Sequence, residues 1–372
     1  MRFFDREPAG HWAAPGRVNL IGEHVDYAGG LCLPFAIAQR TVVAAAPRDD
    51  SLVRLRSEAE PVPVDIDLDD VGPGSPAGWA GYAAGALWAL RAAGHAVRGM
   101  DVLVTDTVPL GSGLSSSAAL ECAVALAADD LFDLGLGGSV DGRRELAAAC
   151  VRAENEVVGA STGGMDQAAA LLATAGHALL LDTRDGSTRQ VPFDPVAAGL
   201  RVLVIDTRVR HRLADSQYGN RRAAVEKAAA TLGVPTLRDV PLSALDVLDP
   251  ELAARARHVI TEIARVREAV ALLDADAPTE IGPLLDASHA SLAGDYDVSC
   301  AELDLACATA RAAGALGARM VGGGFGGSAI ALVPDARVDA VTRAVHAAFE
   351  ADGWLEPAIL EAQPGPAAAR LD

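Results

Sequence analysis

The sequence of 372 residues carries a net charge of −19, and 51% of its residues are hydrophobic. This length predicts two or three domains, and the hydrophobic share is sufficient for substantial cores. The acidic balance, without any run of basic residues, argues against nucleic-acid binding, which depends on a cationic surface.

The cysteines and the apolar segments predict a soluble, cytoplasmic protein. Five cysteines without a CxxC pair argue against a disulfide framework and against a zinc site. Residues 1–10 lack the apolar core of a signal peptide. The longest apolar runs, residues 81–90 and 168–176, are too short to span a bilayer, so we expect no membrane attachment.

The first segment with chemical character is GRVNLIGEHVDYAGG, residues 16–30. Glycines frame its charged residues and apolar residues adjoin them, which favours a polar site against a packed wall over a solvated turn. Carboxylate and imidazole groups are good partners for hydroxyl groups, as in a sugar site. A metal site is the weaker alternative, because no second His or Cys lies at ligand spacing. The candidate residues are Arg17, Glu23, His24 and Asp26.

Apolar periodicity next predicts two strands, residues 41–46 and 51–56, and a helix over residues 79–93 that ends at Gly94. Trp79 begins this helix. Its ring is either part of the core or a platform for a flat ligand, and the residue type alone favours the core.

A short apolar strand, residues 102–104, leads into PLGSGLSSSAALE, residues 109–121, where a helix begins near Ser117. Glycines let the backbone approach a ligand, and a helix N-terminus with serine hydroxyls suits an anion. The segment therefore predicts a phosphate loop, with a serine helix cap as the alternative. The single lysine, Lys227, lies far from any glycine cluster, which excludes a Walker loop and the protein kinases.

Acidic candidates follow on two predicted helices. The first covers residues 143–158, with Asp141 as its N-cap, and contains Glu154 and Glu156. Either glutamate could face inward as a metal ligand, although exposed glutamates are common on helices. In GASTGGMDQ, residues 159–167, Asp166 begins a buried helix and is either its N-cap or a catalytic base.

The second half is predicted to mix helices and strands, after a domain boundary between residues 192 and 199. GGGFGG, residues 322–327, satisfies the dinucleotide-binding pattern but lies between two strands, so it predicts a glycine-rich bend. We interpret His258, His289 and His346 as ordinary helix residues. The expected strands are 177–181, 201–205, 319–321 and 329–333, and the expected helices are 216–232, 251–273, 277–292, 301–313 and 336–349.

Three glycine-framed segments, residues 16–30, 109–121 and 321–332, resemble in sequence and order the motifs of the GHMP kinases. The first is similar to the signature of the galactokinase family within this group. The resemblance covers nearly the whole chain and implies an α+β fold of two domains, residues 1–195 and 196–372, with the active site in the cleft between them. The first domain would resemble domain 2 of ribosomal protein S5, and the second would be ferredoxin-like.

The resemblance implies transfer of phosphate from ATP to the C1 hydroxyl of α-D-galactose, with Mg²⁺ and with no obligate protein partner. Asp166 would face the C1 hydroxyl, and Arg17 would lie beside the reacting centre. The sugar hydroxyls would be bound by Glu23, His24, Asp26, Gly163 and Tyr218.

For ATP, the resemblance implies a loop around the β- and γ-phosphates and an aromatic ring packed on the adenine. Ser117 and Glu154 fall where the Mg²⁺ ligands of the family lie. The loop residues would be Gly111, Ser112, Gly113, Leu114, Ser115, Ser116 and Ser117, and the aromatic residue would be Trp79.

Two departures from the family pattern leave the sugar selectivity open. Val25 replaces a threonine and Ala28 replaces an asparagine, both beside the sugar-binding residues. A kinase for N-acetylgalactosamine or another pyranose is one alternative. A non-catalytic sensor of ATP and sugar is another, although the serine-rich stretch 115–119 is complete.

Overall fold

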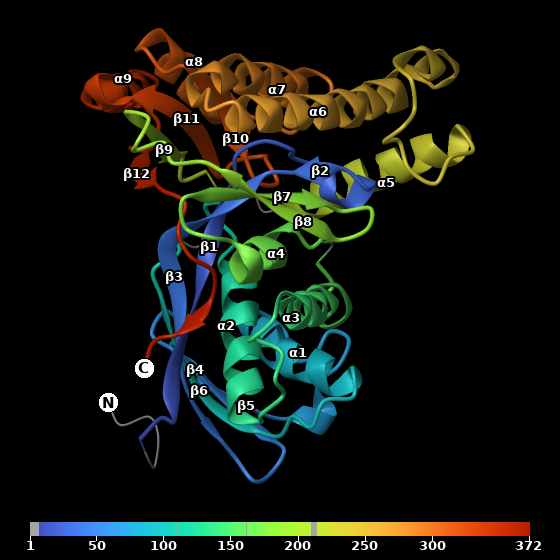
Figure 1. Cartoon of the computed structure of the whole chain (residues 1–372), viewed down its shortest axis with the longest axis vertical. Coiled ribbons are helices and arrows are strands. Elements are labelled where there is room, and N and C mark those ends of the chain that lie inside the picture. Colours follow the sequence, from blue (N-terminus) through green and yellow to red (C-terminus); the bar gives the residue numbers. More distant parts are fainter. Residues whose placement is uncertain (1–6, 110, 161, 210–213) are drawn as a thin grey trace.

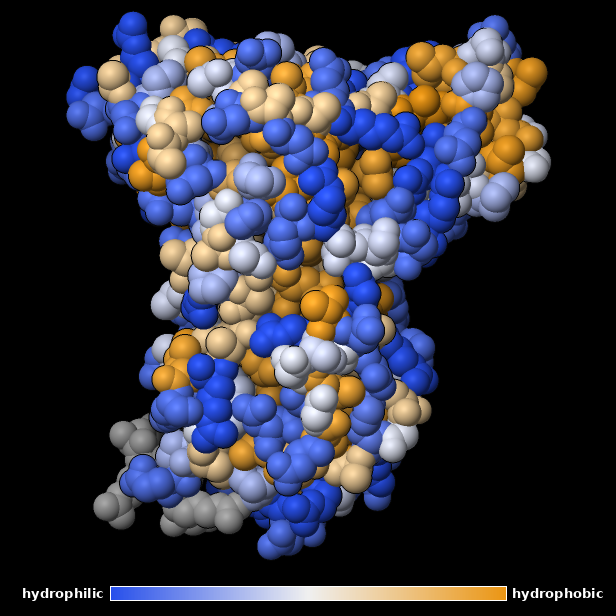
Figure 2. All heavy atoms as spheres, viewed as in Figure 1, coloured by the Kyte–Doolittle hydropathy of each residue, from blue (hydrophilic) through white to orange (hydrophobic). Residues whose placement is uncertain are grey.

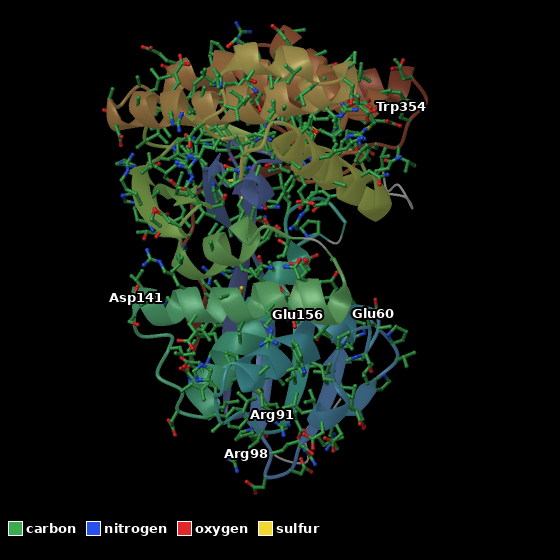
Figure 3. All side chains as sticks on the ribbon, turned by 90° about the vertical axis from the view of Figure 1, so that its right-hand side faces the viewer. Glu60, Arg91, Arg98, Asp141, Glu156 and Trp354 are labelled. Atoms are coloured by element: carbon green, nitrogen blue, oxygen red, sulfur yellow. The ribbon has the colours of Figure 1, made fainter. Side chains whose placement is uncertain are left out.

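The computed structural model describes residues 7–109, 111–160, 162–209 and 214–372. Figure 1 shows a long α+β molecule with one sheet in its lower half and another, covered by helices, in its upper half. Arg98 and Trp354 lie near opposite ends (Figure 3). Hydrophilic residues cover most of the face seen in Figure 2, which narrows between the halves. No helix in the described part is long and apolar enough to cross a membrane.

The sheet of the lower half has the strand order β13-β1-β3-β6-β4-β5. Neighbouring strands are antiparallel, except for β4 and β6, which are parallel. Helix α2 is rich in buried alanines, and these small side chains let it pack closely on α1, β1 and β3. The elements are β1 (Gly10–Asn19), β3 (Pro34–Pro47), β4 (Leu52–Ser57), β5 (Val64–Asp67), β6 (Met100–Asp106), β13 (Ala369–Arg370), α1 (Trp79–Ala92), α2 (Ser116–Leu131) and α3 (Val140–Arg152).

A small sheet and helix α4 lie between the halves (Figure 1). The small sheet has the order β2-β7-β8, and all its pairs are antiparallel. The elements are β2 (Leu31–Cys32), β7 (His177–Asp182), β8 (Ser187–Pro192) and α4 (Met165–Leu172).

The sheet of the upper half has the order β10-β11-β9-β12 and is antiparallel throughout. The predicted glycine-rich bend is confirmed, because residues 322–327 join the paired strands β10 and β11. The elements are β9 (Leu200–Asp206), β10 (Gly317–Val321), β11 (Ser328–Pro334), β12 (Ala358–Ala362), α5 (Ala214–Thr231), α6 (Pro250–Asp274), α7 (Gly282–Gly294), α8 (Ala301–Ala312) and α9 (Val338–Ala351).

One predicted helix differs in its ends. Helix α3 begins after Ser139, whose hydroxyl accepts the N–H of Gly142 at 3.0 Å. The predicted cap, Asp141, instead forms an exposed ion pair with Arg144 at 2.9 Å. At its other end, α3 continues as a π turn (Ala153–Val158).

The buried apolar residues form two clusters, one in each half. Leu20, Ile21 and Val25 of the first glycine-framed segment belong to the upper cluster, together with Val259 and Ile263 of α6. The apolar face of α2 belongs mainly to the lower cluster. Leu114 and Ala119 of the second motif nevertheless belong to the upper cluster, so the first and second motifs share that core. The division into residues 1–195 and 196–372 stays a prediction.

Candidate active site

A cavity of about 520 Å³ lies where the three glycine-framed segments meet. The starts of α2 and α4 line it together with the bend between β10 and β11. Three predicted site residues, Ser112, Gly163 and Trp79, are not part of this lining. The predicted residues that line it are Arg17, Glu23, His24, Asp26, Gly111, Gly113, Leu114, Ser115, Ser116, Ser117, Glu154, Asp166 and Tyr218.

Asp166 lies in the first turn of α4 and is held by side chains from two other segments. Arg17 donates from Nε to Oδ1 at 2.8 Å and from Nη2 to Oδ2 at 2.9 Å. Its Nη1 donates to the carbonyl of Gly113 at 2.6 Å, and the Ser115 hydroxyl donates to Oδ2 of Asp166. The N-cap of α4 is Gly164, with no side-chain cap bond. The carboxylate is therefore fixed at the cavity wall by a two-pronged arginine contact rather than used as a helix cap.

The serine-rich loop turns sharply before α2. Gly111, Gly113 and Ser115 have φ angles of +71°, +77° and +63°, in the left-handed region. Ser115 makes no cap hydrogen bond to the helix, so the alternative of a serine helix cap does not hold. Ser116 and Ser117 begin α2 and line the cavity, where the first N–H groups of a helix lack intrahelical acceptors. This end of the cavity suits an anion.

The second and third segments pack backbone against backbone. A Cβ added to Gly113 would lie 3.3 Å from the carbonyl of Val321, and one added to Gly322 would lie 3.2 Å from the carbonyl of Gly113. The hydroxyl of Ser328 donates to the carbonyl of Ser112 at 2.6 Å. Ser112 therefore joins the two loops from a buried position, and its own hydroxyl donates to the Pro109 carbonyl at 2.7 Å.

Glu154 and Ser117 bring two oxygen ligands together at the cavity wall. The Ser117 hydroxyl lies 3.4 Å from Oε1 of Glu154. Gln167 donates to Oε2 of Glu154 at 2.6 Å and also to the buried Glu121 at 3.0 Å. Burial, followed by the charge of Asp166, raises the pKa of Glu154 to about 7. Two such ligands suit Mg²⁺, which binds through one or two protein oxygens together with phosphates.

Burial distinguishes the two glutamates of the π turn, Glu154 and Glu156. Glu154 is buried, whereas Glu156 is exposed and accepts from Arg152 at 3.0 Å. Figure 3 labels Glu156 on the helical segment that begins near Asp141. No group of three or more His, Cys, Asp or Glu side chains in the described ranges could hold a metal ion by itself. A metal ion at this position would therefore need further ligand atoms from a bound substrate or from water.

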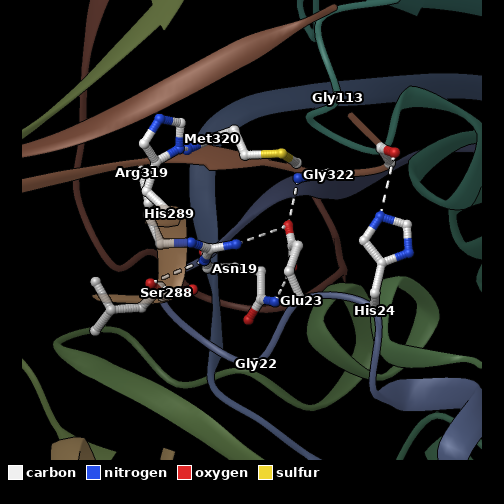
Figure 4. A network of polar contacts seen from close by, with 12 residues as sticks. Asn19, Gly22, Glu23, His24, Gly113, Ser288, His289, Arg319, Met320 and Gly322 are labelled. Carbon is white, nitrogen blue, oxygen red and sulfur yellow. Dashed lines mark hydrogen bonds and ion pairs between the residues drawn. The ribbon is translucent and has the colours of Figure 1, made fainter. Parts of the chain in front are cut away.

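Glu23 connects the first segment to the third (Figure 4). Asn19 Nδ2 and the backbone N–H of Gly322 donate to its two oxygens. Arg319 Nη2 lies 3.5 Å from Oε1, and Nη1 donates to the carbonyls of Asn19 and Leu20 at 2.9 and 3.0 Å. The carboxylate is 2% exposed, so much of its accepting capacity serves the protein itself.

His24 is neutral and engaged at both ring nitrogens. Burial, with the neighbouring His258, lowers the pKa of His24 to about 3. Nε2 donates to the carbonyl of Gly323 at 3.2 Å, while Nδ1 accepts from the hydroxyl of Tyr27 at 2.8 Å. Tyr27 in turn accepts from Tyr296 at 2.7 Å. The sequence predicts that His24 binds sugar hydroxyls. In the structure both ring nitrogens are bonded to protein groups at the cavity wall, Gly323 and Tyr27.

Asp26 and Tyr218 are the polar side chains best placed for a hydroxyl ligand. Burial, with the charges of Asp166 and Glu23, raises the pKa of Asp26 to about 6. Burial raises the pKa of Tyr218 well above its usual value, so its hydroxyl stays a donor. The Tyr218 ring lies 5.2 Å from the ring of His24. Gly163 contributes through its small size, since a Cβ there would collide with the Asp26 carboxylate.

The aromatic residue that helix α1 contributes to the cavity lining is Tyr82 rather than Trp79. Both lie on α1 and pack against the lower core cluster, but Tyr82 also lines the cavity and Trp79 does not. The two residues are three positions apart, so they share one helix face, and the sequence offers no signal to choose between them. Residues 322–324 of the glycine-rich bend also line the cavity, in agreement with a bend that lets backbone approach a ligand.

These elements together suit a group transfer between an anion and a hydroxyl compound. The start of α2 offers N–H groups to an anion. Asp26 and Tyr218 offer an acceptor and a donor to hydroxyl groups, and Asp166 lies in the same cavity, held by Arg17.

Family models match three parts of the chain. The galactokinase galactose-binding signature matches residues 1–47. The GHMP kinases N terminal domain matches residues 81–174, and the GHMP kinases C terminal model matches residues 269–351. Each match contains one of the three motifs singled out in the sequence.

Relatives along the whole chain agree with these models. The galactokinase of Streptomyces coelicolor is 53% identical, covering 99% of this chain and 96% of its own. That of Streptomyces lividans is 50% identical, covering 95% and 89%. The crystal structure of Lactococcus lactis galactokinase complexed with galactose superposes with a TM-score of 0.91 at 34% identity, over 97% of this chain and 95% of that one. This chain is therefore a GHMP kinase with the two-domain α+β fold of that group, and it belongs to the galactokinase family.

Proposed function

We propose that this chain transfers the γ-phosphoryl group of ATP to the C1 hydroxyl of α-D-galactose, giving α-D-galactose 1-phosphate and ADP. Membership of the galactokinase family supports the reaction. The observation that carries it is the position of Asp166, held by Arg17 and Ser115 in a cavity with an anion-binding helix start and two hydroxyl partners.

In the proposed reaction, Asp166 accepts the proton of the C1 hydroxyl as that oxygen forms a bond to the γ-phosphorus. The bond from the γ-phosphorus to the bridging oxygen breaks, and ADP leaves. Arg17 holds Asp166 in place and offsets negative charge on the transferring group. Because phosphoryl transfer has a loose transition state, positioning and charge neutralisation supply most of the catalysis.

The residues present fit a magnesium ion. We propose Ser117 and Glu154 as its protein ligands, because both offer oxygen atoms at the cavity wall. The pKa of Glu154 is raised by burial and by Asp166, and a cation would offset both effects. When bound, Mg²⁺ would neutralise charge on the terminal phosphates of ATP.

We further propose that the enzyme works in the cytoplasm on two small molecules, galactose and ATP, without a protein partner. Dependence on ATP supports this compartment. All five cysteines are free in the structure, as is usual in a reducing compartment.

A sugar panel tests the proposal. ADP release would be measured with Mg-ATP and galactose, N-acetylgalactosamine, glucose, arabinose or galacturonate. We expect the highest kcat/KM with galactose, and a product phosphorylated at C1 by ³¹P and ¹³C NMR. Preference for N-acetylgalactosamine would instead indicate a related sugar kinase. Binding of galactose and ATP without turnover would indicate a sensor, and either result would overturn the proposed reaction.

A further inference from the structure

The backbone turn that presents Glu23 and His24 to the cavity is unusually constrained. Gly22 has a φ of +100°, and a Cβ there would collide with the carbonyl of Leu31. His24 has a φ of +59°, which is uncommon for a residue with a side chain. A turn of this kind persists only where its surroundings hold it.

Two side chains of helix α6, in the upper half, form hydrogen bonds with the backbone of this turn. Oε1 of Glu262 accepts the backbone N–H of Gly22 at 2.9 Å and that of Glu23 at 3.4 Å. One helical turn earlier, Nε2 of His258 donates to the carbonyl of Glu23 at 3.1 Å. The two side chains therefore engage both backbone groups of Glu23, which is itself part of the cavity lining.

Each of the two α6 side chains is itself held in one orientation. Both are 0% exposed. Glu262 also accepts from Ser288 at 2.8 Å and from Arg265 at 2.7 Å. Because the carbonyl of Glu23 can only accept, His258 carries a proton on Nε2. Its Nδ1 lies 3.0 Å from the Ser291 hydroxyl, which fixes the other side of the ring.

Packing alone does not explain these polar contacts. Val259, Ile263 and Val266 on the same helix already anchor the first segment in the upper core. Burying a carboxylate carries a large desolvation cost, and apolar residues of similar size often stabilise a fold as well or better. His258 and Glu262 instead orient the backbone of the turn, because hydrogen bonds are directional and define where its N–H and carbonyl groups point.

We propose that His258 and Glu262 are positioning residues of the sugar site, which fix from α6 the backbone turn that presents Glu23, His24 and Asp26. This inference rests on the proposed sugar kinase function. It predicts a selective effect, because in the described structure neither residue is hydrogen-bonded to the phosphate loop at the start of α2.

The first test compares His258→Phe with His258→Gln. Phenylalanine keeps a ring against Tyr296, which lies 4.5 Å from the His258 ring, but removes both nitrogens. Glutamine restores an N–H donor. We expect His258→Phe to raise the KM for galactose about 10-fold, because the buried carbonyl of Glu23 loses its partner. The KM for ATP should change less than about 2-fold, and glutamine should recover much of the galactose affinity.

The second test compares Glu262→Ala with Glu262→Gln, which retains an acceptor oxygen for the two backbone N–H groups. We expect the KM for galactose to rise in the order wild type, glutamine, alanine. Thr261→Ala is the matched control on the same helix, since the Thr261 hydroxyl bonds only to carbonyls of α6 itself. Direct titration with galactose and with ATP, and circular dichroism of each variant, would accompany the kinetics.

The outcomes separate this inference from the proposed function. If wild type phosphorylates another sugar instead of galactose, the proposed function is overturned, and the same KM comparison is made with that sugar. If folded His258→Phe keeps the wild-type KM for the sugar, or raises both KM values equally, the positioning role is overturned. If Glu262→Ala does not fold, the two His258 variants decide the matter.

Discussion

At the scale of single residues, the orientation of the Asp166 carboxylate is set by two neighbouring side chains. Arg17 fixes the plane of its carboxylate, and Ser115 donates to one of its oxygens. Asp166→Asn keeps the size of this side chain but removes its charge and its basicity. We expect kcat to fall about 100-fold or more, with both KM values changed only a few-fold. Steady-state kinetics would measure this, and near-wild-type turnover by folded enzyme would contradict the assignment.

The ionised carboxylate of Asp26 lowers the stability of the fold, although the proposed sugar binding uses it as a hydrogen-bond acceptor. Its pKa rises from 3.8 in a model compound to about 6 in the fold, through burial and then through Asp166 and Glu23. From pH 4 to 6 the folded state therefore holds a proton that the unfolded chain has lost, so stability falls as pH rises through this window.

The corresponding prediction concerns Asp26→Asn in the absence of ligands. We expect this variant to be about 1–3 kcal/mol more stable than wild type at pH 7, and equally stable near pH 3, where both side chains are neutral. Urea unfolding at the two pH values would measure the difference. The same variant should bind galactose more weakly, since the amide accepts fewer hydroxyl hydrogen bonds. An unchanged stability at pH 7 would contradict the raised pKa.

At the scale of elements, the contact between the second and third loops requires glycine on both sides. Gly113 has a φ of +77°, and an added Cβ would lie 3.3 Å from the carbonyl of Val321. We expect Gly113→Ala to raise the KM for ATP about 10-fold and to destabilise the fold by about 1–3 kcal/mol. Gly135→Ala is the matched control, because Gly135 has a φ of +75° but no atom within 4 Å of the added Cβ. If both variants raise the KM equally, loop contact is not the cause.

The sequence predicted the glycine-framed loops well because their chemistry is local. Arg17 and Asp166 stand in short motifs, and the structure brings them into contact. Which of Trp79 and Tyr82 reaches the cavity depends on how α1 packs, and helical spacing does not distinguish them.

The π turn and helix α6 show a second limit of prediction from sequence. Glu154 and Glu156 are two positions apart, which places them on opposite sides of a helical segment, but periodicity does not say which side the core covers. The structure buries Glu154 and exposes Glu156. Sequence alone predicts His258 to be an ordinary helix residue, whereas it is buried and bonded to Glu23. Its partner lies 235 positions earlier in the chain, and periodicity carries no information about such a contact.

At the scale of the whole molecule, the net charge of −19 acts on the two substrates differently. A strongly acidic protein repels nucleotide anions at long range, while neutral galactose is indifferent to the field. We expect kcat/KM for ATP to rise about 2-fold when ionic strength increases from about 0.02 to 0.15 M, because screening weakens this repulsion. The value for galactose, measured at saturating ATP, should stay constant. A fall for ATP would show that local positive charge dominates the approach.

The contacts between the turn at residues 22–24 and later parts of the chain also have a consequence for folding during translation. Gly22 and Glu262 are 240 positions apart, and Glu23 and Gly322 are 299 positions apart. Ribosomes release the early turn long before its later partners exist, and contacts over such separations are slow to form. In a nascent chain, the turn at residues 22–24 would therefore lack the hydrogen-bond partners that hold it in the folded protein. Competence to recognise the sugar would appear abruptly, after translation of β10 and the bend that follows it.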